Sequence, residues 1–272
     1  MNEKGTVLGI VGSPNPEGIT NQLVTAALKG AADVGAPTEL IQLSEHVVDA
    51  CKDCLPWVCI ENLKCTYDDE AFDYLRHKIL NCGGLVMGTP VYWWDTSGLI
   101  KYLILKMFRV YALSGPLKGL PALGLGIAGG TGNGLVSGLR PVYHFFQMMR
   151  MRALEPVPAT RFNLDQSLKR AGELGEQIAG MASERSPFSC LEEQLVLYDN
   201  LPYLGLSRTE ERRLLADLIA MAVPEEMGSG VLAGLARADA LAAAGRIVES
   251  QVEITRVYEV GVKAFHPDDC PG

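Results

Sequence analysis

The strict alternation of short apolar runs with longer amphipathic runs constrains this chain more than any other feature of its sequence. The apolar runs are short and continuously apolar, which is typical of strands buried in a parallel sheet. The runs between them follow the helical period. Strands are expected at residues 6–11, 39–43, 84–88, 122–127 and 153–157, and helices at 20–34, 68–80, 97–112, 135–151 and 165–182. This alternation predicts an α/β domain over residues 1–185, with a doubly wound five-stranded parallel sheet covered by helices on both faces.

The charge of the chain is concentrated in its last part, residues 186–272. This part carries −7 of the formal net charge of −8. An acidic surface repels phosphate backbones, so nucleic acid is not expected as a partner. The start of the chain lacks the pattern of a signal segment, and Gly, Pro and Lys interrupt every apolar stretch before the roughly 18 residues that a membrane helix needs. We therefore expect a cytoplasmic protein without a membrane partner.

The same acidic part shows helical patterns and no strand pattern. Ser207 and Glu210 form a capping-box pattern that opens a helix. A further helical stretch is expected over residues 230–262, with Gly245 as its weak point. Residues 183–196 are interpreted as a linker. The tail is therefore predicted to be a helical appendage, which either packs against the edge of the sheet or acts as an oligomerisation arm.

Ligands of open parallel sheets bind at the carboxyl ends of the strands. The first expected strand is followed by Gly-Ser-Pro-Asn-Pro-Glu-Gly-Ile-Thr-Asn, residues 12–21. Its neutral donors and the free N–H groups of the next helix suit a phosphate, although an ordinary turn with a Thr cap is the alternative. The loop has neither the lysine of nucleoside triphosphatases nor the spacing of dinucleotide sites, which favours a monophosphate. The residues expected to bind are Ser13, Asn15, Gly18, Thr20 and Asn21.

Two further loops follow the third and fourth expected strands. Residues 88–98 place two tryptophans and a tyrosine where large aromatics are costly to expose, so they either pack on a planar ligand or belong to the core. Residues 129–134 contain four glycines, which let backbone N–H groups approach a ligand edge. Together the three loops predict a flavin mononucleotide, FMN, and cofactor-based redox chemistry without a catalytic side chain. The further expected contacts are Thr89, Pro90, Val91, Tyr92, Trp93, Gly129, Gly130, Thr131 and Gly132.

These loops resemble those of the NADPH-dependent FMN reductase branch of the flavodoxin-like superfamily. The phosphate loop of that family reads Gly-Ser-Pro-Arg-x-x-Gly-Asn-Thr, and this chain departs from it at Asn15 and Ile19. The second loop of the family reads Gly-[Ser/Thr]-Pro-Val-Tyr-[Trp/Phe], which residues 88–93 match throughout. Ser97, Gly98 and Lys101 also resemble the pattern that follows it. The resemblance covers residues 6 to about 182 and implies a flavodoxin-like sheet that binds FMN.

Four of the seven cysteines lie within fifteen residues, as Cys51, Cys54, Cys59 and Cys65. Cytosolic thiols are kept reduced, so a cluster of this kind is more typical of a metal or redox site than of disulfides. Four thiolates suit an iron-sulfur cluster or tetrahedral zinc, and unrelated buried cysteines are the third alternative. Because the stretch follows the second strand, it is expected at the same edge of the sheet as the flavin.

The cysteine stretch, which is followed by Asp68 and Asp69, resembles that of the iron-sulfur flavoprotein subfamily. That resemblance implies that the four cysteines hold a [4Fe-4S] cluster and that a homo-oligomer, a dimer or tetramer, brings cluster and flavin together. The spacing here is C-x2-C-x4-C-x5-C, with two more residues between the second and third cysteines than the subfamily usually has. A large parallel sheet does not need zinc to fold, whereas a cluster beside a flavin has a redox role, which favours the cluster.

The leading hypothesis is a flavin-dependent oxidoreductase with FMN and [4Fe-4S] that passes electrons from a one-electron donor such as a ferredoxin to an acceptor. A second hypothesis is an NAD(P)H-dependent FMN or quinone reductase with zinc or no metal at the cysteines. A third is a flavin-free, zinc-stabilised interaction module with an acidic helical tail.

Overall fold

The computed structural model describes residues 5–56, 58–130 and 132–265. Its centre is a parallel sheet in which the strands follow the order β2-β1-β3-β4, and both β5 and β6 pair with β4. This order confirms the predicted doubly wound, flavodoxin-like α/β fold. The strands are β1 Val7–Val11, β2 Thr38–Gln42, β3 Gly84–Pro90, β4 Pro121–Ala128, β5 Arg152–Ala153 and β6 Val157–Thr160.

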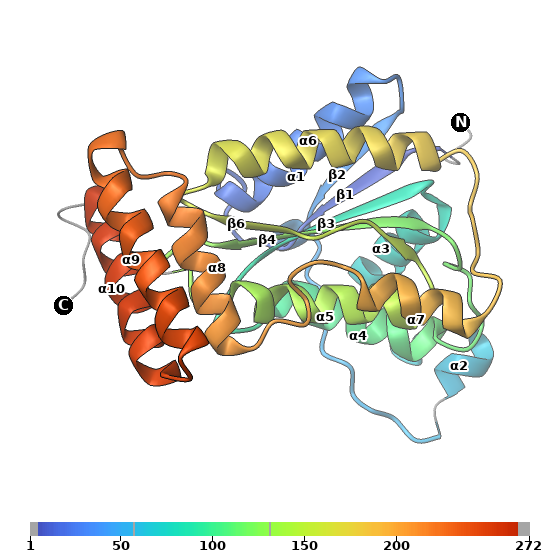
Figure 1. Ribbon diagram of the computed structural model, residues 1–272. Helices are drawn as coiled ribbons and strands as arrows, with labels where there is room; N and C mark the ends of the chain where they lie inside the picture. Colours follow the sequence, from blue (N-terminus) through green and yellow to red (C-terminus); the bar gives the residue numbers. More distant parts are fainter. Residues whose placement is uncertain (1–4, 57, 131, 266–272) are drawn as a thin grey trace.

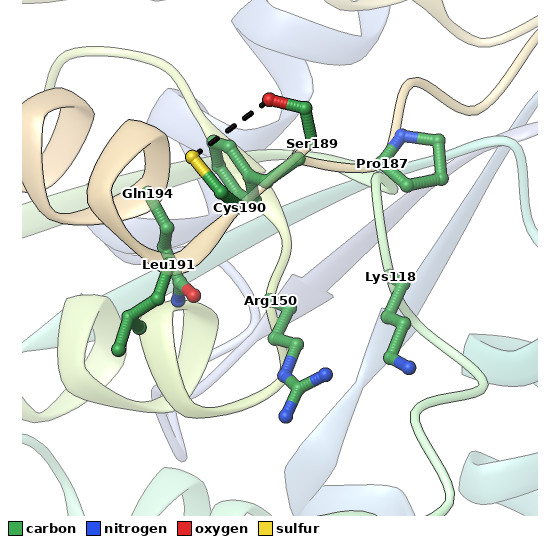
Figure 2. A pocket seen from close by; sticks show the side chains of 8 residues that line it. Lys118, Arg150, Pro187, Ser189, Cys190, Leu191 and Gln194 are labelled. Carbon is green, nitrogen blue, oxygen red and sulfur yellow. Dashed lines mark hydrogen bonds between the residues drawn. The ribbon is translucent and has the colours of Figure 1, made fainter.

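Helices cover both faces of the sheet (Figure 1). On one face lie α1 Ile19–Asp33 and α6 Leu164–Met181, and on the other lie α3 Glu70–Asn81, α4 Gly98–Tyr111 and α5 Leu135–Met148. Each layer closes its own apolar core against the sheet. The two helices of the first layer approach so closely that a Cβ at Gly30 or Gly175 would overlap the backbone of the facing helix. Glycine at both positions therefore allows this contact.

The fifth predicted strand is interrupted, and its predicted end is wrong. Ala153 pairs with Ala122, whereas Val157 pairs with Leu125, so the register shifts by one residue between the two pairs. An extra residue of this kind is a β-bulge, and Pro156 within it has no N–H to donate to a ladder. The chain thus forms the two-residue β5 and then β6, which continues to Thr160.

The expected linker at residues 183–196 already contains the start of a helix, α7 Leu191–Asp199. Tyr198 anchors this helix, because its ring is buried in the same core as α4 and α5 and its hydroxyl donates to the Met151 carbonyl at 2.9 Å. This segment is therefore packed on the second helical layer. The prediction of a linker missed it because its apolar period is too short to be distinguished from a loop.

The final three helices, α8 Arg208–Ala220, α9 Glu225–Ala243 and α10 Ile247–Phe265, form a unit of their own at the end of the sheet where β4 and β6 finish (Figure 1). We call it the three-helix unit. The capping box of Ser207 and Glu210 is confirmed at the start of α8. The stretch expected after residue 230 is divided at Gly245, whose φ of +74° suits the left-handed turn between α9 and α10.

A search of the described residues for a helix long and apolar enough to cross a bilayer found none.

Candidate functional site

The expected phosphate loop lies between β1 and α1. A Cβ at Gly12 would overlap Ile100 and lie 2.9 Å from the Gly88 carbonyl, so only glycine allows this loop to pass so close to β3. Ser13 Oγ accepts from the Asn15 N–H at 3.1 Å, which shapes the turn. Gly18 is the N-cap of α1 and has no side chain to cover the helix start. The positive end of α1 is therefore available to an anion.

The other polar residues predicted in this loop have local roles in the structure. Asn15 Oδ1 accepts from the Glu17 N–H at 3.0 Å. Thr20 is buried, with its methyl group next to Gly88. Asn21 Oδ1 accepts from the Thr25 hydroxyl at 3.1 Å. The loop thus offers mainly backbone N–H groups rather than side chains to a ligand.

Gln42, at the end of β2, is a residue that the sequence reasoning missed. It is 6% exposed, and its Nε2 donates to the Ser13 carbonyl and to Ser44 Oγ. Among the described residues its Oε1 has no hydrogen-bond partner. A buried acceptor is costly unless a donor satisfies it, so this oxygen suits a hydroxyl of a ligand or of solvent. The only signal in the sequence was a polar residue directly after the two apolar residues of this strand, Leu40 and Ile41.

The aromatic loop projects a tryptophan into solvent from a strained turn. Tyr92 and Asp95 exchange two backbone hydrogen bonds of 3.0 Å, and Trp93 and Trp94 between them have φ values of +53° and +58°. Such turns normally use Asn or Gly, and each residue in this conformation costs about 1–2 kcal/mol. The Trp93 side chain is nevertheless 90% exposed. Strain that holds a large apolar ring in water is typical of a functional site.

The other predicted residues of this loop lie beneath it. Thr89 is fully buried, and its Oγ1 bonds to Thr96 Oγ1 at 2.6 Å and accepts from the Ser97 N–H at 3.0 Å. Pro90 is buried within β3, and Val91 packs against the apolar cluster that the end of β4 and the start of α5 share with the three-helix unit. These three residues support the loop, while Tyr92 and Trp93 form its accessible surface.

A cavity of about 390 Å³ connects the phosphate loop with the aromatic loop. A volume of this order is ordinary for a small-molecule site. Its wall is largely apolar and is built by Pro14, Ser44, Val47, Tyr92, Ser97, Gly98, Leu99 and Tyr102. The structure therefore joins two of the three loops that the sequence singled out.

The glycine loop after β4 has an open half and a packed half. Among the described residues, a Cβ at Gly129 or Gly130 would meet nothing within 4 Å, and both glycines are exposed, so the backbone there is accessible. A Cβ at Gly132 would lie 2.8 Å from Leu215 and 3.2 Å from the Tyr258 hydroxyl. Thr131, also predicted to bind, lies outside the described residues. The open half can approach a ligand, while the packed half rests on the three-helix unit.

These loops lie within the part of the chain that a model of the NADPH-dependent FMN reductase family matches, residues 6–160. The chain belongs to this family. Members of the family are flavin-dependent oxidoreductases, which sets aside the flavin-free interaction module, and the match supports FMN as the flavin. The orphaned oxygen of Gln42, the uncovered start of α1 and the cavity beside Tyr92 are compatible with that cofactor.

The chain is also similar to curated proteins that are named iron-sulfur flavoproteins. An iron-sulfur flavoprotein of Methanocaldococcus jannaschii is 29% identical over 64% of this chain and 95% of its own length. An iron-sulfur flavoprotein of Archaeoglobus fulgidus is 25% identical over 71% of this chain and 88% of its own length. These relatives confirm the resemblance to the iron-sulfur flavoprotein subfamily.

Solved structures confirm the fold of this family member. A flavone reductase has a TM-score of 0.52 at 19% identity and covers 70% of this chain and 69% of its own. An NAD(P)H:quinone oxidoreductase from Methanothermobacter marburgensis has a TM-score of 0.50 at 15% identity, over 64% of this chain and 98% of its own. The family model ends at residue 160, before α6 and the three-helix unit begin.

The cysteine stretch does not lie beside the flavin loops of its own chain, contrary to expectation. Cys59, in the short helix α2 Val58–Asn62, donates its thiol to the Arg109 carbonyl at 3.8 Å, and the Tyr111 hydroxyl donates to the Leu63 carbonyl at 3.3 Å. Arg109 and Tyr111 are at the end of α4, which runs from the carboxyl end of β3 to the amino end of the sheet. Figure 1 shows α2 at that end of α4, away from the three-helix unit.

The separation follows from the length of α4. Its 14 residues span about 20 Å from the aromatic loop, where the helix begins, to the cysteine stretch at its other end. The sequence predicted the stretch at the carboxyl edge of the sheet because it follows the second strand. It could not foresee that the loop would continue along the outside of α4.

The four thiols share one loop but have different neighbours. Burial raises the pKa of Cys59, and the nearby Cys54 and Cys51 raise it further. Cys54 Sγ lies 3.6 Å from Thr66 Oγ1, and Cys65 is partly buried against the main core. Among the described residues, no three His, Cys, Asp or Glu side chains converge as metal ligands. The donor chemistry of four thiols fits an iron-sulfur cluster or zinc.

Asp69, which the sequence reasoning treated only as part of a motif, closes the cysteine loop. Its carboxylate accepts from the Asp49 N–H at 3.0 Å and from the Phe72 N–H at 2.9 Å, and it pairs with Lys106 of α4. Both charged side chains are 4% exposed. Asp49 and Asp69 flank the four cysteines, so one buried ion pair holds both ends of the loop against α4.

Proposed function

We propose that this chain is an electron-transferring flavoprotein with FMN at the carboxyl edge of its sheet and a [4Fe-4S] cluster at Cys51, Cys54, Cys59 and Cys65. One observation carries the proposal: α4 begins at the exposed aromatic turn and ends beneath a loop of four cysteines anchored by Arg109 and Lys106. The names of the similar curated proteins support the same pair of cofactors.

Bound FMN supplies both one-electron and two-electron redox chemistry. The chain contributes binding and orientation. The uncovered start of α1 would hold the phosphate through backbone N–H groups, and Tyr92 and Trp93 offer aromatic faces to a planar ring. The accessible backbone at Gly129 and Gly130 would donate to the ring edge, which favours an anionic reduced flavin.

At the cysteine loop the chain contributes ligands and charge. Four thiolates are the usual ligands of a [4Fe-4S] cluster. The guanidinium of Arg109 lies within the loop, where it bonds to Asp53 at 2.8 Å. A fixed cation next to a group of thiolates lowers the cost of bringing their negative charges together.

The position of the cysteine loop also supports a homo-oligomer, a dimer or tetramer. With about 20 Å of α4 between the loop and the aromatic turn, a cluster would approach the flavin of a second copy of the chain. We further propose a ferredoxin-like one-electron donor and a cytoplasmic location.

A second candidate is an NAD(P)H-dependent FMN or quinone reductase with zinc or no metal at the cysteines. It is favoured by the family match, and by the finding that no three potential metal ligands converge among the described residues. Hydride transfer from a nicotinamide to the flavin needs no cluster.

One set of measurements tests both candidates. We would purify the protein without oxygen and determine FMN, iron, acid-labile sulfide and zinc per chain, and then follow flavin reduction by reduced ferredoxin and by NADPH. About four iron and four sulfide with one FMN, and fast reduction by ferredoxin alone, support the first candidate. FMN with zinc or no metal, together with fast reduction by NADPH, replaces it with the second.

A further inference from the structure

The three-helix unit packs directly on the loops of the candidate flavin site. One apolar cluster joins Ala128 at the end of β4 and Leu135 at the start of α5 to Leu215 of α8 and Tyr258 of α10. Figure 1 shows the unit standing across this end of the sheet. Arg140 of α5 also donates to the Leu204 carbonyl, just before α8, at 2.8 Å. Apolar contacts therefore join the unit to the end of β4 and to α5, and a hydrogen bond holds the segment that leads into the unit.

Glu211 of α8 caps the helix that follows the glycine loop. Its Oε1 accepts from the Val136 N–H at 3.1 Å, in the first turn of α5. The N-cap of α5 is Gly134, which has no side chain to do this. Glu211 is 6% exposed, and a buried carboxylate is costly unless it is compensated. The positive end of α5 provides that compensation, so α8 supplies the cap that the local sequence lacks.

The same loop is held from two sides. Gly132 packs against Leu215 and Tyr258, while a Cβ at Gly134 would lie 2.8 Å from the Trp94 ring of the aromatic turn. Within the part of the chain that the structure describes, no such contact restricts Gly129 and Gly130. The packed half of the loop is thus fixed between the three-helix unit and the aromatic turn. Because the two halves are continuous in the chain, the packed half orients the open half.

We propose that Glu211 is a positioning residue of the flavin site, and that the three-helix unit supports the glycine loop of that site rather than acting as a separate oligomerisation arm. The inference rests on the proposed function in one respect, which is that the open half of the glycine loop contacts FMN. It extends that function to a part of the chain beyond the family model, which ends at residue 160.

The test compares Glu211→Ala, Glu211→Gln and Glu210→Ala in the full chain. Gln retains an acceptor oxygen for the Val136 N–H, whereas Ala removes it. Glu210 belongs to the capping box of α8 and is exposed, so its loss weakens α8 without touching α5. It is therefore the matched control for general loosening of the three-helix unit.

Titration of the apoprotein with FMN should show a dissociation constant roughly tenfold higher for Glu211→Ala, and within about twofold of wild type for the other two variants. Hydrogen exchange of apoprotein peptides over residues 129–136 should accelerate in Glu211→Ala alone. Unchanged FMN binding and exchange in Glu211→Ala, or an equal effect of Glu210→Ala, would overturn the inference. A wild-type chain that does not bind FMN would instead refute the proposed function, while the exchange experiment still decides whether Glu211 positions the loop.

Discussion

The carboxylate of Asp69 and the ammonium of Lys106 form an ion pair that is almost fully buried between the start of α3 and the middle of α4. Burial by itself would raise the pKa of Asp69, but Lys106 and the N–H groups of Phe72 and Asp49 outweigh it, so the pKa is lowered from 3.8. The pair therefore stabilises the fold and holds the base of the cysteine loop at the same time.

Replacing Asp69 with Ala should reduce the free energy of unfolding by about 3–5 kcal/mol, because it leaves the Lys106 charge buried without its partner. Chemical denaturation measures the change. Lys29→Met, in the exposed pair with Asp33, is the control and should cost less than about 1 kcal/mol. If both substitutions lower the free energy of unfolding equally, burial does not strengthen the pair of Asp69 and Lys106.

The same pair predicts how stability depends on pH. A carboxylate whose pKa is lower in the folded state stabilises the protein fully above its unfolded value, here 3.8. This contribution is lost as the pH falls from that value through the lower folded pKa. The difference in the free energy of unfolding between wild type and Asp69→Asn, measured by chemical denaturation, should therefore shrink as the pH is lowered below 3.8. A difference in the free energy of unfolding that stays constant across this pH range would contradict the lowered pKa of Asp69.

Gln42 should affect FMN binding through the phosphate loop, because its amide donates to the Ser13 carbonyl. Gln42→Leu should weaken FMN binding roughly fivefold, as expected for the loss of about one hydrogen bond. Gln42→Glu should weaken it more and should affect riboflavin, which has no phosphate, less than FMN. Gln22→Leu, at an exposed position of α1, is the control. Equal losses for both flavins would place Gln42 away from the phosphate.

Trp93→Gly should separate stability from function at the aromatic turn. Glycine tolerates the positive φ, and the indole that it removes is 90% exposed, so the free energy of unfolding should stay the same or rise by up to about 1 kcal/mol. FMN binding should weaken, as it should in Tyr92→Ala, while Tyr74→Ala on α3 should leave it unchanged. If Trp93→Gly and Tyr92→Ala both bind FMN normally, the turn does not face the flavin.

Cys54→Ala should abolish iron binding and its visible absorption while FMN stays bound, because the cysteine loop and the flavin loops are at opposite ends of α4. The control is Cys190→Ala, an exposed cysteine that caps α7 and contributes nothing to this loop. Iron content and the flavin spectrum measure both effects. Full iron content in Cys54→Ala would remove that residue from the ligand set.

Local sequence patterns predicted the alternation of strands and helices and the loops expected to carry the site, whereas the strand order came from the structure. Parallel strands joined by helices must bring their carboxyl ends to one edge, so the loops at residues 12–21, 88–98 and 129–134 could be placed there without coordinates. The buried end of β2 at Gln42 escaped the same reasoning, because one polar residue in a strand does not reveal what its side chain faces. Within the aromatic loop, only the structure separated the exposed Tyr92 and Trp93 from the buried Thr89.

The sequence by itself determined the α/β fold, the edge of the sheet at which a ligand is expected and the presence of four neighbouring thiols, since each depends on local period or residue type. The tertiary structure alone decided that the thiols lie along α4, and that Glu211 of the acidic tail caps α5 at Val136. These contacts join residues 50 and 75 positions apart. Local periodicity shows which face of an element is apolar, but the packing of all the elements together determines which faces meet.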